Sequence, residues 1–137
     1  MHKGPAQTVD YMRAFVPLAE PLVASADIAL LPPFIDLVTL RDQLAGTTIG
    51  FGGQDCFWES EGAYTGEISA TMLKDLGAAY CVVGHSERRR YFGENDAQVA
   101  RKVEALIEAG LTPIVCVGES LEENQSGRTR ERVTTQI

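Results

Sequence analysis

Polar side chains follow three short apolar runs of this chain, and their types could support chemistry at a carbonyl group. Gln54 comes after the first of these runs, His85 and Glu87 after the second, and Glu119 after the third. If the runs are parallel strands, their carboxyl ends meet at one edge of a sheet, where the connecting loops converge on a crevice. We therefore expect these side chains to lie at a common site.

His85 is the residue of this set best suited to catalysis. Gly84 lets the backbone turn sharply where a strand ends, and Ser86 or Glu87 suits the first turn of a helix. His85 would then face the partial positive charge of a helix N-terminus, which disfavours the charged imidazolium. A neutral ring can donate a hydrogen bond to a carbonyl oxygen as the substrate becomes an enediolate. The alternative is a structural histidine, which on local sequence alone is the more frequent case.

The composition fits a globular domain and excludes several functional classes. The chain has 137 residues, of which 45% are hydrophobic and 23% are charged, close to the average of globular proteins. Its formal net charge of −7 does not favour binding to nucleic acids or anionic membranes, because both need clustered Lys and Arg. We therefore expect neither a nucleic-acid partner nor a membrane partner.

Neither a membrane span nor a metal site is expected. No stretch reaches the roughly 18 apolar residues of a membrane-spanning helix, and the start lacks the apolar segment of a signal peptide, so we expect a cytoplasmic location. The three cysteines form no CxxC pair and have no histidine at metal-ligand spacing. We interpret them as buried thiols in a reducing compartment.

The elements that must position the polar groups alternate between amphipathic stretches and short apolar runs, which is typical of an α/β protein with a parallel sheet. Strands are predicted at residues 28–31, 48–51, 79–83 and 113–117. Helices are predicted at residues 8–25, 35–44, 69–74, 96–109 and 128–133. Residues 58–66 show no periodicity and indicate an ordered loop. No linker divides the chain, so we expect a single domain.

Local signals predict where two of these helices begin. Thr8 is the predicted N-cap of the first helix, and Pro17 and Pro21 should kink or divide that helix. Asn95 and Gln98 have the spacing of a capping box, which places the start of the helix over residues 96–109.

Four parallel strands with right-handed crossovers suit either an open doubly wound sheet or half of a closed barrel, and periodicity does not decide between them. The string CVVGHSERRRYFGE, however, closely resembles the fourth-strand signature of the triosephosphate isomerase family. In the same order, GGQDCFWESEGAYTGEIS resembles the family's third strand and loop, PIVCVGES its fifth strand, and the opening MHKG the segment after its first strand. These strings span nearly the whole chain.

The resemblance implies an α/β fold that is a partial (β/α)8 TIM barrel, with strands 2 to 5 and their flanking helices, roughly helix 1 to helix 5. The single domain would then be incomplete, lacking strand 1 and the carboxyl-terminal part. A neutral histidine facing a helix N-terminus is already a known feature of triosephosphate isomerases, so for this family it is not a new prediction.

Two residues take catalytic roles by this resemblance. His85 matches the electrophile that polarises the substrate carbonyl and shuttles protons between the two substrate oxygens. Glu87 matches a buried carboxylate near the family's active-site lysine, with a simple helix N-terminal charge as the alternative.

Other residues take supporting roles by the same resemblance. Tyr64, Thr65 and Gly66 match the tip of a loop that inserts into the neighbouring subunit of a homodimer, with an ordinary surface turn as the alternative. Gln54 matches a position at the interface that also supports the site. Cys116 and Glu119 match the end of the fifth strand, where packing and support of the site are expected. Asp55 departs from the asparagine often found at its position, and no chemistry is assigned to it.

The implied reaction interconverts dihydroxyacetone phosphate and glyceraldehyde 3-phosphate through an enediolate, without a cofactor, in glycolysis and gluconeogenesis. The implied partners are a small phosphorylated triose and, in the full-length parent, a second subunit. The family's glutamate base and its phosphate-binding groups would lie outside residues 1–137, so we expect this chain alone to be inactive. The alternatives are another phosphate-handling β/α-barrel enzyme, or a non-catalytic remnant or interaction module.

Overall fold

Four parallel strands form one sheet in which neighbours follow the chain order, β1-β2-β3-β4. The computed structural model describes residues 1–137 and places the strands at Ala29–Leu30 (β1), Gly50–Gly53 (β2), Tyr80–Val83 (β3) and Thr112–Val115 (β4). In a doubly wound sheet the strand order reverses at a switch point, whereas consecutive strands of a barrel stay neighbours. The sheet therefore has the arrangement of part of a (β/α)8 barrel, and the predicted fold class is confirmed.

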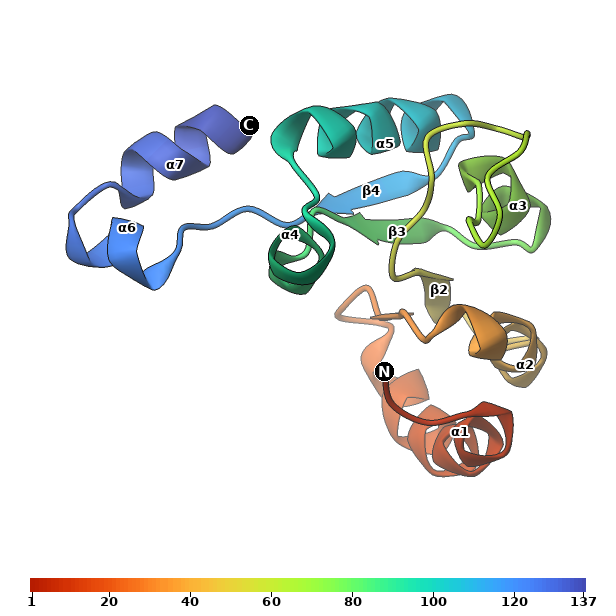
Figure 1. The fold of residues 1–137 in the computed structure, drawn as a ribbon. Helices are drawn as coiled ribbons and strands as arrows, with labels where there is room; N and C mark the ends of the chain where they lie inside the picture. Colours follow the sequence, from red (N-terminus) through yellow and green to blue (C-terminus); the bar gives the residue numbers. More distant parts are fainter.

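Helices connect the strands and flank the sheet (Figure 1). The longer ones are α1 (Pro5–Ala19), α2 (Leu37–Gln43), α4 (Ser86–Phe92), α5 (Asp96–Glu108) and α7 (Thr129–Gln136). The shorter ones are α3 (Ala70–Asp75), α6 (Leu121–Gln125) and the 3-10 turns η1 (Glu20–Leu22) and η2 (Phe34–Asp36). In Figure 1 the β3 and β4 arrows point toward α4, so the carboxyl ends of these strands lie on the side of α4.

The start of α1 differs from the prediction. The helix begins at Pro5, three residues before the predicted cap, because proline suits the first helical position, where its missing N–H leaves no bond unmade. Thr8 is buried within the helix, and its N–H donates to the Gly4 carbonyl at 2.9 Å. Pro17 does not divide the helix, which runs on to Ala19 before the 3-10 turn η1.

Two other predicted helix starts are confirmed. The Ser69 hydroxyl accepts a hydrogen bond from the Met72 N–H at 3.2 Å, which caps α3. At α5, Asn95 and Gln98 form the predicted capping box, each side chain accepting from the other residue's N–H at 3.0 Å. The strand β2 begins at Gly50 rather than at Thr48, two residues later than predicted.

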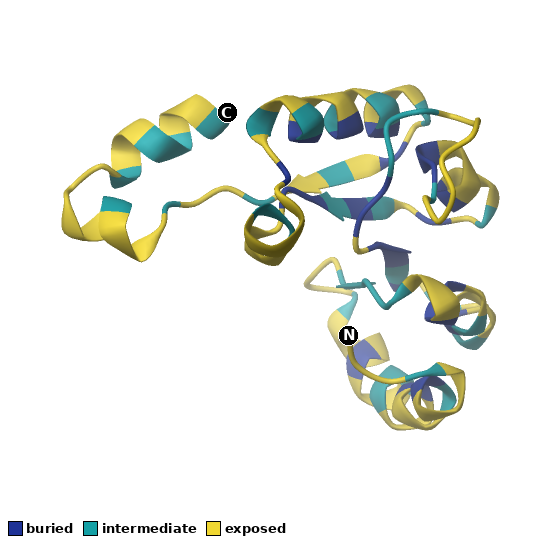
Figure 2. Ribbon diagram, viewed as in Figure 1, coloured by how far each residue is buried: buried dark blue, intermediate teal, exposed yellow.

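The hydrophobic core lies between the sheet and its flanking helices (Figure 2). Leu106 of α5, Val83 and Cys81 of β3, and Leu73 of α3 are almost completely buried there. Cys56 is buried as well, so the prediction of buried thiols is confirmed for Cys56 and Cys81, while Cys116 is half-buried. No helix of the chain is both long enough and apolar enough to cross a membrane.

Residues 118–137 form a carboxyl-terminal arm that carries α6 and α7 away from the sheet (Figure 1). Neither helix contains a buried residue. The prediction of helix only at residues 128–133 missed α6. That helix has a capping box of its own, in which the side chains of Ser120 and Glu123 each accept from the other residue's N–H.

Candidate functional site

His85 lies at the turn between β3 and α4, where its side chain caps the helix. The ring nitrogen Nδ1 accepts a hydrogen bond from the Glu87 N–H at 3.3 Å. Because Nδ1 acts as the acceptor, the proton of a neutral ring sits on Nε2, which is left to donate to another group. The side chain as a whole is 47% exposed.

Gly84 creates the turn that presents this ring. Its φ of +71° lies in the left-handed region, which side chains other than glycine rarely adopt. A Cβ atom here would lie 3.0 Å from Arg89 Nη2, 3.1 Å from Val99 Cγ2 and 3.2 Å from the Cys116 carbonyl oxygen. A larger residue would therefore be both strained and crowded, and the direction of His85 depends on glycine at this position.

The expected burial of the Glu87 carboxylate is wrong for this chain, because its side chain is 73% exposed. Glu87 lies in the first turn of α4, a helix without buried residues, and nothing packs over its carboxylate. Its Oε2 atom lies 3.7 Å from His85 Nδ1. The backbone N–H of Glu87, rather than its carboxylate, makes the closer contact with the ring.

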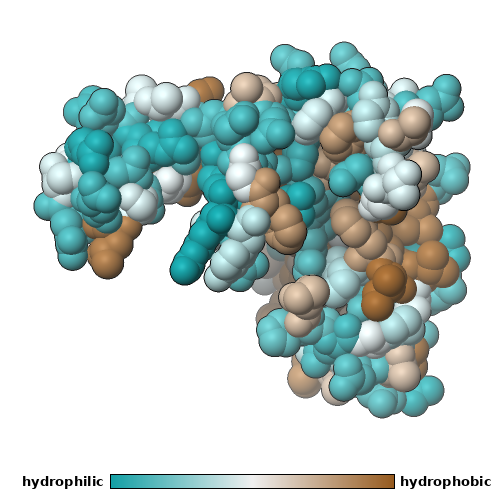
Figure 3. All heavy atoms as spheres, in the orientation of Figure 1, coloured by the Kyte–Doolittle hydropathy of each residue, from teal (hydrophilic) through white to brown (hydrophobic).

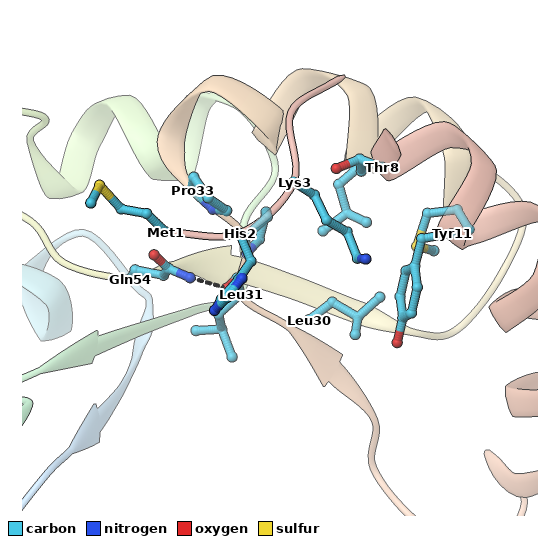
Figure 4. A pocket seen from close by; sticks show the side chains of 12 residues that line it. Met1, His2, Lys3, Thr8, Tyr11, Leu30, Leu31, Pro33 and Gln54 are labelled. Carbon is cyan, nitrogen blue, oxygen red and sulfur yellow. Dashed lines mark hydrogen bonds between the residues drawn. The ribbon is translucent and has the colours of Figure 1, made fainter. Parts of the chain in front are cut away.

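Gln54 follows β2 and ties two strand ends together. Its Nε2 donates to the Leu31 carbonyl, just beyond β1, at 2.8 Å. Beside it lies a pocket of about 220 Å³, lined mainly by the chain start, α1 and the segment after β1. Figure 4 shows the exposed His2 and Lys3 on the rim of this pocket, with the Gln54 amide pointing toward Leu31.

Cys116 and Glu119 follow β4, but only the cysteine adjoins the turn of His85. The Cys116 N–H donates to the Val83 carbonyl at 2.9 Å, and burial raises the pKa of its thiol while the charge of Arg89 opposes the shift. Glu119 accepts from Asn124 Nδ2 at 2.7 Å and from the Thr129 hydroxyl at 2.9 Å within the arm. No hydrogen bond joins Gln54, His85 and Glu119, although all three follow carboxyl ends of strands.

The loop over residues 58–66 is ordered without being regular structure, as predicted. The rings of Phe57 and Trp58 stack with centroids 4.1 Å apart, and the Tyr64 ring lies 4.6 Å from that of Phe57. Thr65 and Gly66 are exposed at its tip. The packed aromatic rings therefore fix the shape of the loop, and Thr65 and Gly66 at its tip stay exposed.

A buried ionic cluster lies behind α4, and the sequence did not predict it. Lys102 Nζ donates to both Asp55 oxygens, at 2.7 and 2.9 Å, and to Glu94. Arg88 Nε forms ion pairs with Asp55 at 2.8 Å and with Glu94 at 3.6 Å. The side chains of Lys102 and Glu94 are each 4% exposed, and that of Arg88 is 30% exposed. Burial raises the pKa of Asp55, against the hydrogen bond and charge of Lys102.

The cluster matters for the site because Arg88 lies in α4, the helix that His85 caps. Asp55, two residues after β2, was the available signal, but its partner Lys102 is 47 residues away. The chain contains no group of three or more His, Cys, Asp or Glu side chains placed as metal ligands.

Comparison with known families identifies the chain. The model of the triosephosphate isomerase family matches residues 1–137, the whole sequence. The chain belongs to the triosephosphate isomerase family. The predicted resemblance is thereby confirmed, and with it the assignment to a family of isomerases.

Relatives and solved structures agree with this assignment. The triosephosphate isomerase of Thermoanaerobacter pseudethanolicus is 48% identical over 136 residues, covering 99% of this chain and 54% of the relative. That of Thermus thermophilus is 50% identical over 127 residues, covering 93% of this chain and 50% of the relative. The crystal structure of the Bartonella henselae enzyme is 44% identical, with a TM-score of 0.77, covering 80% of this chain and 46% of the other. The chain thus spans about half the length of the triosephosphate isomerases it matches.

Proposed function

We propose that this chain supplies the carbonyl-polarising half of a triosephosphate isomerase active site. The whole enzyme would interconvert dihydroxyacetone phosphate and glyceraldehyde 3-phosphate. The observation that carries the proposal is the ring of His85, whose Nδ1 accepts from the Glu87 N–H and whose Nε2 is left to donate. Membership of the family supports the same reaction.

In this mechanism, Nε2 of His85 donates a hydrogen bond to the carbonyl oxygen of the substrate. A carboxylate base removes a proton from the adjacent carbon, and the negative charge that develops on the oxygen strengthens the bond from the ring. The same ring can carry a proton from one oxygen of the enediolate to the other. A proton returned to the neighbouring carbon completes the isomerisation, so no cofactor is required.

The base and the phosphate-binding groups are proposed to come from the other half of the barrel, which this chain does not span. Closure of the site against water is needed as well, because an exposed enediolate would lose its phosphate. Glu87 remains a second proposed acid–base group, since its carboxylate lies 3.7 Å from the ring. Gln54, Cys116 and Glu119 are proposed to support the rim rather than to touch the substrate.

The proposed assembly is a homodimer in which the tip of the loop over residues 58–66 enters the partner subunit. Two observations support it. Tyr64, Thr65 and Gly66 are exposed on a loop that its own aromatic residues hold in shape. An apolar groove of about 270 Å³ also lies between α2 and α3, lined partly by the exposed Phe34 and Met72, and Figure 3 shows hydrophobic side chains gathered in this region.

A chimaeric enzyme tests the reaction. In the T. pseudethanolicus enzyme, the matching residues are replaced by this chain, so that the relative supplies the remaining half. We expect triosephosphate isomerase activity, and we expect His85→Gln to lower kcat by about 10²- to 10⁴-fold, the range of general acid–base catalysis. His2→Gln is the control, because His2 is the other histidine of the chain and is exposed. Unchanged turnover of the His85→Gln enzyme would contradict the proposal.

Two further measurements test the remaining parts. The 137-residue chain alone should show no isomerase activity above background, and ordinary turnover would refute that expectation.

For the homodimer, Thr65→Arg in the chimaera should shift the protein to the monomer in light scattering after gel filtration. Glu104→Arg, an exposed change on α5, should leave the dimer intact.

A further inference from the structure

The Arg89 side chain holds the backbone directly before His85. Its Nε atom donates to the carbonyl of Gly84, the residue before the histidine, at 2.8 Å. The carbonyl of His85 itself accepts from the backbone N–H groups of Arg88 at 2.9 Å and Arg89 at 3.1 Å, as in any helical first turn. The side chain of Arg89 is therefore the group that ties the peptide before His85 to α4.

The guanidinium of Arg89 is in turn held by Asp96. Arg89 Nη1 donates to Asp96 Oδ1, and Arg132 of α7 donates to Asp96 Oδ2 at 2.8 Å. The Arg89 side chain is only 16% exposed, so solvent competes weakly for these bonds. Burial tends to raise the pKa of Asp96, but hydrogen bonds from Arg132 and Arg89 outweigh it and hold that pKa below its ordinary value. Asp96 therefore stays charged near neutral pH.

The neighbouring arginines do not share this arrangement. Arg88 points to the buried cluster, where it pairs with Asp55. Arg90 is exposed and lies over the ring of Tyr91, 5.1 Å from its centroid. Of the three consecutive arginines, only Arg89 bonds to the carbonyl next to His85.

We infer that Arg89 is a positioning residue, whose side chain fixes the direction of the His85 ring by holding the Gly84 carbonyl, with Asp96 orienting its guanidinium. The inference rests on the proposed function in one respect: the ring of His85 is the group that works on the substrate. Without the hydrogen bond from the Arg89 side chain to the Gly84 carbonyl, the left-handed turn at Gly84 can relax, and the bond from the Glu87 N–H to His85 Nδ1 is weakened. The ring then samples orientations in which Nε2 no longer points to one place.

Nitrogen-15 NMR of the 137-residue chain tests this role of Arg89 without measuring catalysis. In the native chain, the uncharged form of the His85 ring should carry its proton on Nε2 alone. In Arg89→Met, the two ring nitrogens should shift toward averaged values, and the Glu87 amide should exchange about fivefold faster, as expected for loss of one net hydrogen bond. Arg90→Met is the matched control and should leave both signals unchanged. Native-like ring signals in a folded Arg89→Met chain would overturn the inference.

Steady-state kinetics of the chimaera provide the second measurement and do not require the chain to fold alone. Arg89→Met should lower kcat by about a hundredfold, the cost of misplacing a reacting group by about 1 Å, with little change in KM. Arg89→Lys keeps the charge but cannot reach Gly84 and Asp96 together, so it should recover only part of the loss. Equal losses for Arg89→Met and Arg90→Met, or unfolding of both Arg89 variants, would show a merely structural role and overturn the inference. An inactive parent chimaera would count against the proposed function instead, and the ring tautomer would still decide the role of Arg89.

Discussion

Ion pairs stabilise both the sheet region, meaning the sheet with its flanking helices, and the carboxyl-terminal arm. The residues involved are deeply buried in the sheet region but not in the arm. Behind α4, Lys102 and Glu94 are almost completely buried, and each charge has a partner. In the arm, neither α6 nor α7 has a buried residue, and the ion pair of Arg132 with Asp96 links α7 to the rest of the chain. A buried charge costs several kcal/mol when it loses its partner, whereas an exposed pair is worth about 0–1 kcal/mol. The comparison predicts that equivalent changes unfold the sheet region but only loosen the arm.

The largest electrostatic effect is expected for Lys102→Met. The change leaves the buried carboxylates of Asp55 and Glu94 with Arg88 as their one remaining cation, which should lower the free energy of unfolding by about 3 kcal/mol. Urea denaturation measures the change. Arg101→Met, at the exposed neighbouring position that pairs with Glu59, should cost about 0–1 kcal/mol. Similar losses of unfolding free energy in the Lys102→Met and Arg101→Met variants would contradict the burial of the Lys102 cluster.

The same leucine substitution can be placed in both regions. Leu106→Ala removes a fully buried side chain from α5 and should cost about 2–5 kcal/mol through lost burial and the cavity left behind. Leu121→Ala removes a side chain that is mostly exposed at the start of α6 and should change global stability by no more than about 0.5 kcal/mol. Thermal unfolding of the two variants, followed by circular dichroism, makes the comparison. A large loss in Leu121→Ala would mean that the arm packs on the core.

Two capping boxes sharpen the comparison at a smaller scale. Asn95→Ala and Ser120→Ala each remove an N-cap side chain, and each should cost about 1 kcal/mol. For Asn95 the cost should appear in the global free energy of unfolding, because α5 packs on the core. For Ser120 it should appear only as faster amide exchange within α6. If Ser120→Ala shifted the global transition as much as Asn95→Ala, the two regions would unfold as one unit.

The smallest effect is a pH dependence, of one sign for the carboxylates that hold the arm, Asp96 at its attachment to α5 and Glu123 within it, and of the opposite sign for Asp55 in the buried cluster. Asp96 and Glu123 have pKa values held below their ordinary 3.8 and 4.5, so their stabilising contribution is complete above those values and is lost as the pH falls through the lower folded-state pKa. Asp55 has a raised pKa, so its titration favours the folded state below pH 3.8 and that contribution is lost as the pH rises through the folded pKa. Between pH 6 and pH 3, amide protection factors of α7 should fall before those of α5. Simultaneous loss in both helices would contradict this assignment.

The sequence predicted the features that depend on neighbours along the chain. The capping box of Asn95 and Gln98, the glycine turn before His85 and the strand order could be inferred because each follows from local residue types or from the family strings. The helix α6 was missed although Ser120 and Glu123 carry the same signal as Asn95 and Gln98, because no apolar stripe follows them.

Apart from α6, the features that were missed depend on distant partners. Whether Glu87 is covered depends on packing across α4, which its own sequence neighbours do not reveal. The partner of Asp55 lies 47 residues along the chain, and that of Arg132 lies 36 residues back. Charges of this kind appear in a sequence as ordinary surface residues, and only the fold shows which of them are buried together.

Pro113 limits how a further strand can join β4. The N–H groups of Thr112 and Cys116 donate to carbonyls on the β3 side, so alternation along the strand directs positions 113 and 115 to the open edge. Proline has no N–H, which leaves Val115 as the single backbone donor that β4 offers outward. The carbonyls of Pro113 and Val115 still face this edge as acceptors, but an incoming strand can accept only one hydrogen bond from β4. The missing donor favours the register that places an acceptor opposite Val115 and makes indiscriminate pairing at this edge less favourable.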